Sequence, residues 1–140
     1  MNPSPPSKLP LSGLRVLAVE QYGAGPFGTS YLADLGAEVI KIENHKDGGD
    51  VGRHVGPHFF GPDDSHFFQT FNRNKKSLTV DLKHPEGSAV FRKLVAGADA
   101  IHLSGYSFVA SSPRRAVLGA MAKAGETPVS VDPASAEFLR

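Results

Sequence analysis

Short apolar runs rich in β-branched residues alternate along this chain with segments of helical periodicity, and this alternation limits the fold more than any other feature. The runs that predict strands are 15–20, 38–43, 77–82, 100–104 and 127–132, and the segments that predict helices are 26–35, 85–96 and 112–124. Buried strands that alternate with helices form a parallel sheet, because each crossover helix packs onto one of its faces. We therefore expect an α/β fold, with a Rossmann-like open parallel sheet and helices on both faces.

The first helix has signals at both ends. Pro26 suits a first turn, where its missing N–H is not needed, and Gly36 suits the position after the last turn. The apolar residues between them are Phe27, Tyr31, Leu32 and Leu35. Residues 44–76, in contrast, have no sustained period and predict a long loop.

Length, charge and the absence of cysteine exclude several classes of protein. The 140 residues fit one domain or part of one, and residues 1–10 form a Pro-rich lead-in without the apolar core of a secretory signal. Fifteen Lys and Arg against 14 Asp and Glu give a net charge of +1, too low for an electrostatic nucleic-acid binder. No Cys is present, and no apolar run reaches the roughly 18 residues of a membrane span. We expect a cytoplasmic protein that binds neither nucleic acid nor membrane.

The histidines do not predict a metal site. His54 and His58 stand four residues apart, but Gly56-Pro57 between them breaks the helix that would bring both rings to one face. His102 lies in an expected strand and is interpreted as a core residue. Spacing alone assembles neither a Ser-His-Asp set nor a pair of carboxylates, so we assign no catalytic residue and no metal ligand.

A glycine-rich turn between the first strand and the first helix allows two interpretations. Gly23-Ala-Gly25-Pro-Phe-Gly28 has the G-x-G-x-x-G spacing of an NAD-type dinucleotide site, and Glu43 at the end of the next strand would accept a hydrogen bond from a ribose hydroxyl. Pro26 removes one amide that would face a phosphate, and Phe27 is bulky where the backbone must approach it. The alternative is a tight turn that binds no ligand.

The densest cationic stretch follows the long loop. It consists of Arg73, Lys75, Lys76 and Lys83. Cations at this place would stabilise the phosphate groups of a nucleotide, whereas a solvated basic loop is the alternative.

Several separate motifs in residues 11–99 occur in the order and at the spacing of a known family. They are Leu11-Ser-Gly-Leu-Arg-Val-Leu17, Ala24-Gly-Pro26, Leu32-Ala-Asp-Leu-Gly-Ala-Glu-Val-Ile-Lys-Ile-Glu43, Gly48-Gly-Asp50 with Arg53, Phe71-Asn-Arg-Asn-Lys-Lys-Ser-Leu-Thr-Val-Asp-Leu-Lys83 and Pro85-Glu-Gly87. With these motifs the chain resembles the N-terminal segment of class III CoA-transferases, a family that includes formyl-CoA and carnitine CoA-transferases and α-methylacyl-CoA racemase.

The resemblance implies a Rossmann-like domain in an interlocked homodimer, which moves coenzyme A between carboxylic acids through an aspartyl-CoA thioester. It implies CoA contacts from the turn after the first strand, from the end of the second strand, where Asn44 replaces a common arginine, and from the end of the third strand. Ser104 stands at the position of a family asparagine. With the basic stretch included, the expected CoA-binding residues are Tyr22, Gly23, Ala24, Asn44, Arg73, Lys75, Lys76, Val80, Asp81, Leu82, Lys83 and Ser104.

The family resemblance ends near residue 99. Residues 100–140 instead resemble a segment of ribokinase-like sugar kinases, which have similar strand ends, here His102-Leu-Ser-Gly-Tyr106 and Val129-Ser-Val-Asp-Pro-Ala-Ser135. The family's catalytic aspartate would follow beyond this sequence, and the surroundings of Asp132 do not match it. We therefore expect a truncated family member that binds CoA or acyl-CoA and is inactive alone. An NAD-type module and a non-catalytic remnant or fusion are the alternatives.

Overall fold

Five parallel strands form the central sheet of the computed structural model, which describes residues 8–105, 118–119, 121–122 and 124–132. They are β1 (Arg15–Val19), β2 (Glu38–Glu43), β5 (Lys76–Thr79), β6 (Ala100–Ser104) and β7 (Val129–Asp132), in the spatial order β5-β2-β1-β6-β7. Every pair of neighbouring strands is parallel. The α/β class and the parallel sheet expected from the sequence are confirmed.

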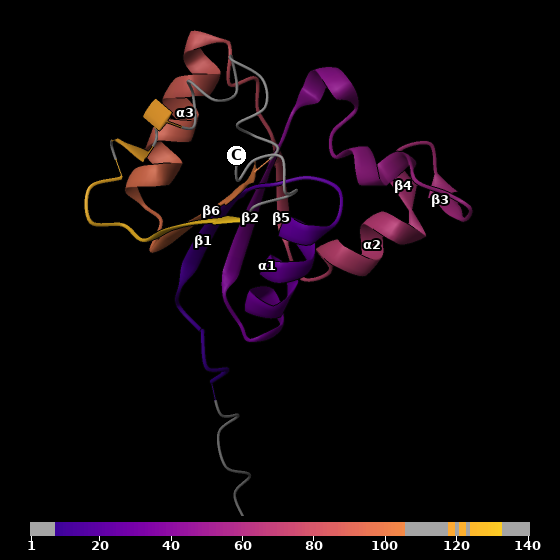
Figure 1. Ribbon diagram of the computed structural model, residues 1–140, viewed down its shortest axis with the longest axis horizontal. Helices are drawn as coiled ribbons and strands as arrows, with labels where there is room; N and C mark the ends of the chain where they lie inside the picture. Colours follow the sequence, from indigo (N-terminus) through magenta and orange to yellow (C-terminus); the bar gives the residue numbers. More distant parts are fainter. Residues whose placement is uncertain (1–7, 106–117, 120, 123, 133–140) are drawn as a thin grey trace, which may run out of the picture.

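Helices α1 (Ala24–Asp34) and α3 (Pro85–Ala96) cover opposite faces of this sheet (Figure 1). Successive side chains of a strand point to opposite faces, so β1 sends Val16 to one layer and Leu17 to the other. The layer under α1 is built from small residues such as Ala33. The layer under α3 is larger, and its buried side chains include Leu17, Ile42, Val80, Phe91, Val95, Ile101 and Leu103.

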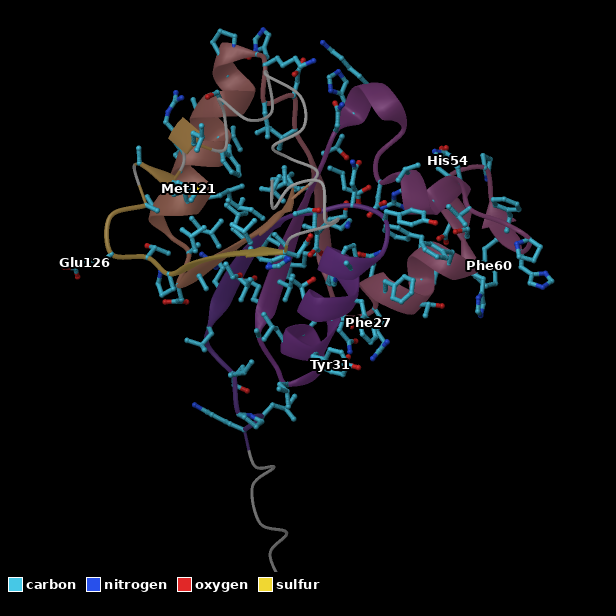
Figure 2. All side chains as sticks on the ribbon, in the orientation of Figure 1. Phe27, Tyr31, His54, Phe60, Met121 and Glu126 are labelled. Carbon is cyan, nitrogen blue, oxygen red and sulfur yellow. The ribbon has the colours of Figure 1, made fainter. Side chains whose placement is uncertain are left out.

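The face that α1 buries differs from the apolar face expected from its sequence. Its buried residues are Gly25, Pro26, Thr29, Ser30 and Ala33. Phe27 and Tyr31 are instead about half exposed, at 49% and 54%, and Figure 2 shows both on α1 close to α2. Small residues let α1 approach the polar end of the sheet closely, and the large side chains therefore lie on its outer side.

Aromatic rings continue from α1 onto α2 (His66–Asn72). Ring centroids lie 5.1 Å apart for Tyr31 and Phe27, 5.9 Å for Phe27 and Phe71, 5.0 Å for Phe71 and Phe67, and 5.1 Å for Phe67 and Tyr22. We call these five residues the aromatic run. Their spacing is typical of favourable aromatic pairs, so the aromatic run helps to hold α2 against α1.

Residues 44–76, expected to be a loop, contain several short elements. They are η1 (His45–Asp47), η2 (Val51–His54), the antiparallel pair β3 (Phe59–Gly61) and β4 (Asp64–Ser65), and α2. Ser65 caps α2 by accepting a hydrogen bond from the N–H of Phe68 at 3.1 Å, and its hydroxyl donates to the carbonyl of Gly52 at 2.7 Å. The expectation of an irregular segment is therefore wrong, because caps and short turns order these residues without a long apolar period.

The C-terminal part of the chain is described only in pieces, since residues 106–117, 120, 123 and 133–140 lie outside the described residues, as do 1–7 of the lead-in. Of the helix expected over 112–124, Leu118, Gly119 and Met121 are helical. The strand expected over 127–132 is confirmed as β7. Within the described ranges, no helix is long and apolar enough to cross a membrane.

The order of the strands reverses at β1. The chain runs from β1 outward to β2 and β5, and then crosses to the other side of β1 to form β6 and β7. In open α/β sheets, ligands bind beyond the carboxyl ends of the strands at such a switch point. The fold therefore favours a binding site at the carboxyl edge of the sheet.

Candidate functional site

The carboxyl edge of the sheet carries most of the residues expected to bind CoA. They are Tyr22, Gly23 and Ala24 after β1, Asn44 after β2, Val80, Asp81, Leu82 and Lys83 after β5, and Ser104 at the end of β6. Two contacts join the separate loops. The N–H of Tyr22 donates to Asp50 Oδ1 at 2.8 Å, and Lys46 Nζ lies 3.1 Å from Asp81 Oδ2. The loops after β1, β2 and β5 therefore contact one another at this edge.

The basic stretch does not form a single cluster. Arg73 pairs with Asp34 at the end of α1, and Lys76 Nζ lies 2.5 Å from Glu38 Oε1 at the start of β2. Both of these charges therefore point away from the carboxyl edge. Lys83, in contrast, is exposed at that edge, and its ammonium has no carboxylate partner among the described residues.

Lys75 is buried beneath α1. Its ammonium donates to Glu20 Oε1 at 2.9 Å, to the carbonyl of Pro26 at 2.8 Å and to Asn72 Oδ1 at 3.3 Å. Burial lowers the pKa of Lys75 to about 8, although the nearby Glu20 carboxylate acts in the opposite direction. In this position Lys75 joins the first turn of α1 to the end of α2.

Lys75 is one of four buried charged residues below the turn after β1. Lys41 Nζ lies 2.6 Å from Asp50 Oδ2 and 3.8 Å from Glu20 Oε1, and it donates to the backbone carbonyl of Glu20 at 3.2 Å. The side chains of Lys41, Glu20 and Asp50 are at most 1% exposed. Two ammonium groups thus face two carboxylates, and this mutual pairing is what allows charges to be buried.

Glu43 has no free oxygen. Its Oε1 accepts from Arg53 Nη2 at 2.8 Å and Ser77 Oγ at 2.6 Å, and its Oε2 accepts from Arg53 Nε at 2.8 Å and the N–H of Asp50 at 2.6 Å. A carboxylate offers about four acceptor positions, so none remains for a ribose hydroxyl. This geometry speaks against the NAD-type interpretation of the glycine-rich turn. A Cβ at Gly25 would lie 2.8 Å from Asp132 Oδ2, so this glycine is required for packing.

The carboxyl group of Glu43 makes the stability sensitive to acid. Burial alone would raise its pKa, but the bonds from Arg53, Ser77 and the Asp50 amide outweigh burial and lower the pKa from 4.5 to about 2. Between these two values the unfolded chain binds more protons than the folded one, so the stabilisation is complete above about pH 4.5 and is lost as the pH falls toward 2. As the pH falls from 5 to 2.5, we expect the free energy of unfolding to decrease less in Glu43→Gln than in the wild type. Urea unfolding at each pH measures this difference.

The control for this measurement is Glu126→Gln. Glu126 is exposed in the turn before β7 and has no ion pair among the described residues (Figure 2). Its replacement is expected to keep the pH dependence of the wild type. Parallel stability curves for Glu43→Gln and the wild type would contradict the role assigned to Glu43.

His102 and Asp132 form a polar pair between β6 and β7. His102 Nδ1 is 2.9 Å from Ser130 Oγ, and His102 Nε2 faces the carboxylates of Asp132 and Glu20 at 3.5 and 4.0 Å. His102 is thus partnered at Nδ1, as a core histidine should be, whereas Nε2 forms no hydrogen bond among the described residues. Ser104, on the same strand, is buried and lies opposite Asp132 in the sheet.

Sequence reasoning missed the buried charges that organise this edge. Lys41 interrupts the apolar run Val39-Ile-Lys-Ile, and a charge inside a buried strand is the signal that indicates a partnered lysine. Asp50 stands in a loop, where its burial leaves no pattern. No group of three or more His, Asp or Glu side chains in the described ranges is arranged to hold a metal ion.

The family model described as CoA-transferase family III matches residues 11–122 of this sequence. The chain belongs to CoA-transferase family III. The match continues past residue 99 and includes β6, so it assigns residues 100–122 to this family. The expected resemblance of these residues to sugar kinases is therefore not supported.

Two named relatives are identical to this chain at more than two fifths of the aligned positions. Succinate–glutarate CoA-transferase of Agrobacterium fabrum is 43% identical over 106 residues, which are 72% of this chain and 26% of that protein. The alpha subunit of succinyl-CoA–L-malate CoA-transferase of Chloroflexus aurantiacus is 47% identical over 92 residues, 66% of this chain and 21% of that subunit. The chain therefore spans between a fifth and about a quarter of the length of these relatives.

Two solved structures have a similar fold. Rv3272 from M. tuberculosis matches with a TM-score of 0.70 and 33% identity, over 87% of this chain and 33% of its own. A CAIB/BAIF family protein from Brucella suis matches with a TM-score of 0.64 and 33% identity, over 79% of this chain and 31% of its own.

Proposed function

We propose that the carboxyl edge of the sheet binds the CoA part of CoA thioesters, for transfer of CoA between carboxylic acids. The observation that carries this proposal is the meeting of Tyr22–Ala24, Asn44 and residues 80–83 at one edge, in a chain of CoA-transferase family III. α1 begins within the first of these segments, and the N-terminus of a helix favours phosphate groups. Lys83 adds a cation at the same edge.

Dicarboxylic acids are the proposed acyl groups. The relatives described above are named for succinate, glutarate and malate, and the human relative, 44% identical over 90 residues, is named succinyl-CoA:glutarate CoA-transferase. A homodimer and a cytoplasmic location remain predictions from the family resemblance and from composition.

We further propose that these 140 residues supply the CoA-binding part of this reaction and do not complete the transfer by themselves. The resemblance implies an aspartate that receives the acyl group, and no aspartate in this sequence stands in a matching motif. Formation of a new CoA thioester from succinyl-CoA and glutarate by the purified chain would contradict it.

Isothermal titration with CoA and with NAD separates the proposed function from its alternatives. We expect measurable binding of CoA and none of NAD, because Glu43 is occupied by Arg53. Binding of NAD that depends on Glu43 would favour the dinucleotide module instead. Binding of neither compound would favour a non-catalytic remnant.

The contribution of Lys83 can be measured in the same way. Lys83→Ala is expected to weaken CoA binding about tenfold, since one charge-assisted hydrogen bond contributes roughly 1.5 kcal/mol. Lys76→Ala provides a matched control, because Lys76 is also exposed but pairs with Glu38 at the start of β2. Equal weakening of CoA binding by both substitutions would mean that Lys83 acts only through the overall charge of the chain and makes no specific contact with CoA.

A further inference from the structure

The backbone of Tyr22 adopts a conformation that is rare for residues other than glycine. Its φ is +69°, in the left-handed region, where the Cβ atom is close to the following carbonyl oxygen. A tyrosine adopts such a conformation only when its surroundings impose it. Tyr22 is also the first of the three residues proposed to contact CoA after β1, so whatever imposes this conformation also shapes the site.

Asp50 contacts the backbone of Tyr22 directly. Asp50 Oδ1 accepts hydrogen bonds from the N–H groups of Tyr22 and Gly52, both at 2.8 Å. Asp50 is itself held in place, because its own N–H donates to Glu43 Oε2 at 2.6 Å. The loop after β2 therefore fixes the loop after β1 through one buried carboxylate.

Lys41 contacts the backbone of the same turn at Glu20. Its ammonium lies 2.6 Å from Asp50 Oδ2 and donates to the carbonyl of Glu20 at 3.2 Å. The carbonyl that it holds precedes Tyr22 by two residues, and the N–H that Asp50 holds belongs to Tyr22. One buried ion pair thus contacts the backbone on both sides of Gln21, before the chain enters α1.

From this geometry we infer that Asp50 is a positioning residue for CoA binding, which holds Tyr22 in its left-handed conformation and so fixes the segment Tyr22–Ala24, while Lys41 balances the buried charge of Asp50. This inference rests on the proposed function, since it concerns the same edge of the sheet. The Asp50 side chain is not exposed, so it acts on CoA through the backbone of the turn.

Two substitutions of Asp50 distinguish positioning from general stabilisation. Asp50→Asn keeps an oxygen that can accept from Tyr22 but removes the charge that pairs with Lys41, whereas Asp50→Ala removes both. We expect both variants to have a lower Tm than the wild type. CoA affinity should stay within about threefold in Asp50→Asn and fall at least tenfold in Asp50→Ala. Affinity losses that follow the Tm losses in both variants would overturn the inference.

A second pair of variants leaves the buried ion pair intact. Tyr22→Pro removes the donor to Asp50 and forces a negative φ, whereas Tyr22→Ala removes the ring alone. We expect CoA to bind at least tenfold more weakly to Tyr22→Pro than to Tyr22→Ala. Equal affinities of the two variants would show that the left-handed conformation is not needed.

Amide hydrogen exchange provides a readout that does not depend on CoA. The Tyr22 amide should be protected in the wild type and in Asp50→Asn, and should exchange at least tenfold faster in Asp50→Ala. If the wild type does not bind CoA, the proposed function fails while this measurement still tests the positioning of Tyr22. Unchanged exchange of Tyr22 in a folded Asp50→Ala variant would overturn the inference.

Discussion

Replacing Lys41 by methionine is expected to lower the free energy of unfolding by about 3–5 kcal/mol, the usual loss when one partner of a buried ion pair is removed. Methionine fills a similar volume, so the loss comes from charge. Glu20 and Asp50 would keep their carboxylates at 1% exposure or less, with Lys75 as the remaining buried cation in the network. Such a loss is a large part of the roughly 5–15 kcal/mol of a typical domain, and urea unfolding followed by circular dichroism measures it.

Lys46→Met is the matched control for this prediction. Lys46 also pairs with an aspartate, Asp81, at 3.1 Å, but its side chain is 56% exposed. Exposed ion pairs contribute about 0–1 kcal/mol, so the control should change stability by less than 1 kcal/mol. Similar losses in the two variants would mean that the buried charge of Lys41 contributes no more to the free energy of unfolding than an exposed ion pair does.

Gly87→Ala is expected to destabilise the chain by about 3 kcal/mol, at the upper end of the usual range for overpacking. A Cβ at Gly87, in the first turn of α3, would lie 2.1 Å from the carbonyl oxygen of Asp81. That atom belongs to the backbone, so no side-chain rotation relieves the contact, and α3 or residues 80–83 must move. The same variant should therefore also bind CoA more weakly than the wild type.

Gly97→Ala tests whether this effect comes from the contact itself. Gly97 ends α3, and the nearest atom to an added Cβ is 3.7 Å away, which is ordinary van der Waals distance. We expect a change within about 0.5 kcal/mol, as for most substitutions that disturb no contact. A loss at Gly97 as large as that at Gly87 would point to helix propensity or chain flexibility as the cause.

The sheet and its main helices are predictable from the sequence because their signals are local and repeated. β-Branched runs predict β2 and β6 at the residues where they occur, and Pro85 with a period of helical spacing predicts α3. The candidate site is predictable in part for a related reason. Residues that directly follow parallel strands lie at one edge, so the positions of Tyr22, Asn44 and Asp81 follow from the strand assignments.

The remaining features depend on partners that are distant in sequence. Nothing near Lys75 indicates that it is buried against Glu20, 55 residues earlier, so a basic stretch was expected where the structure has separate ion pairs. Phe27 is a large apolar residue of α1, so its sequence favours burial. The polar groups beneath the helix admit only small side chains, and Phe27 is instead about half exposed. α2 has only 7 residues, which is about two turns. Its apolar period is therefore too brief to distinguish it from a loop.

The aromatic run has an optical consequence. The chain contains no Trp and three Tyr, so its intrinsic fluorescence comes from tyrosine. Tyr22 and Tyr31 stand at the two ends of the aromatic run, and the ring of Tyr22 lies 5.1 Å from that of Phe67, on the turn that Asp50 holds. A variant that keeps Tyr22 as its single tyrosine therefore has an emitting group built into the proposed CoA-binding turn, and its anisotropy reports the motion of that turn without any added label.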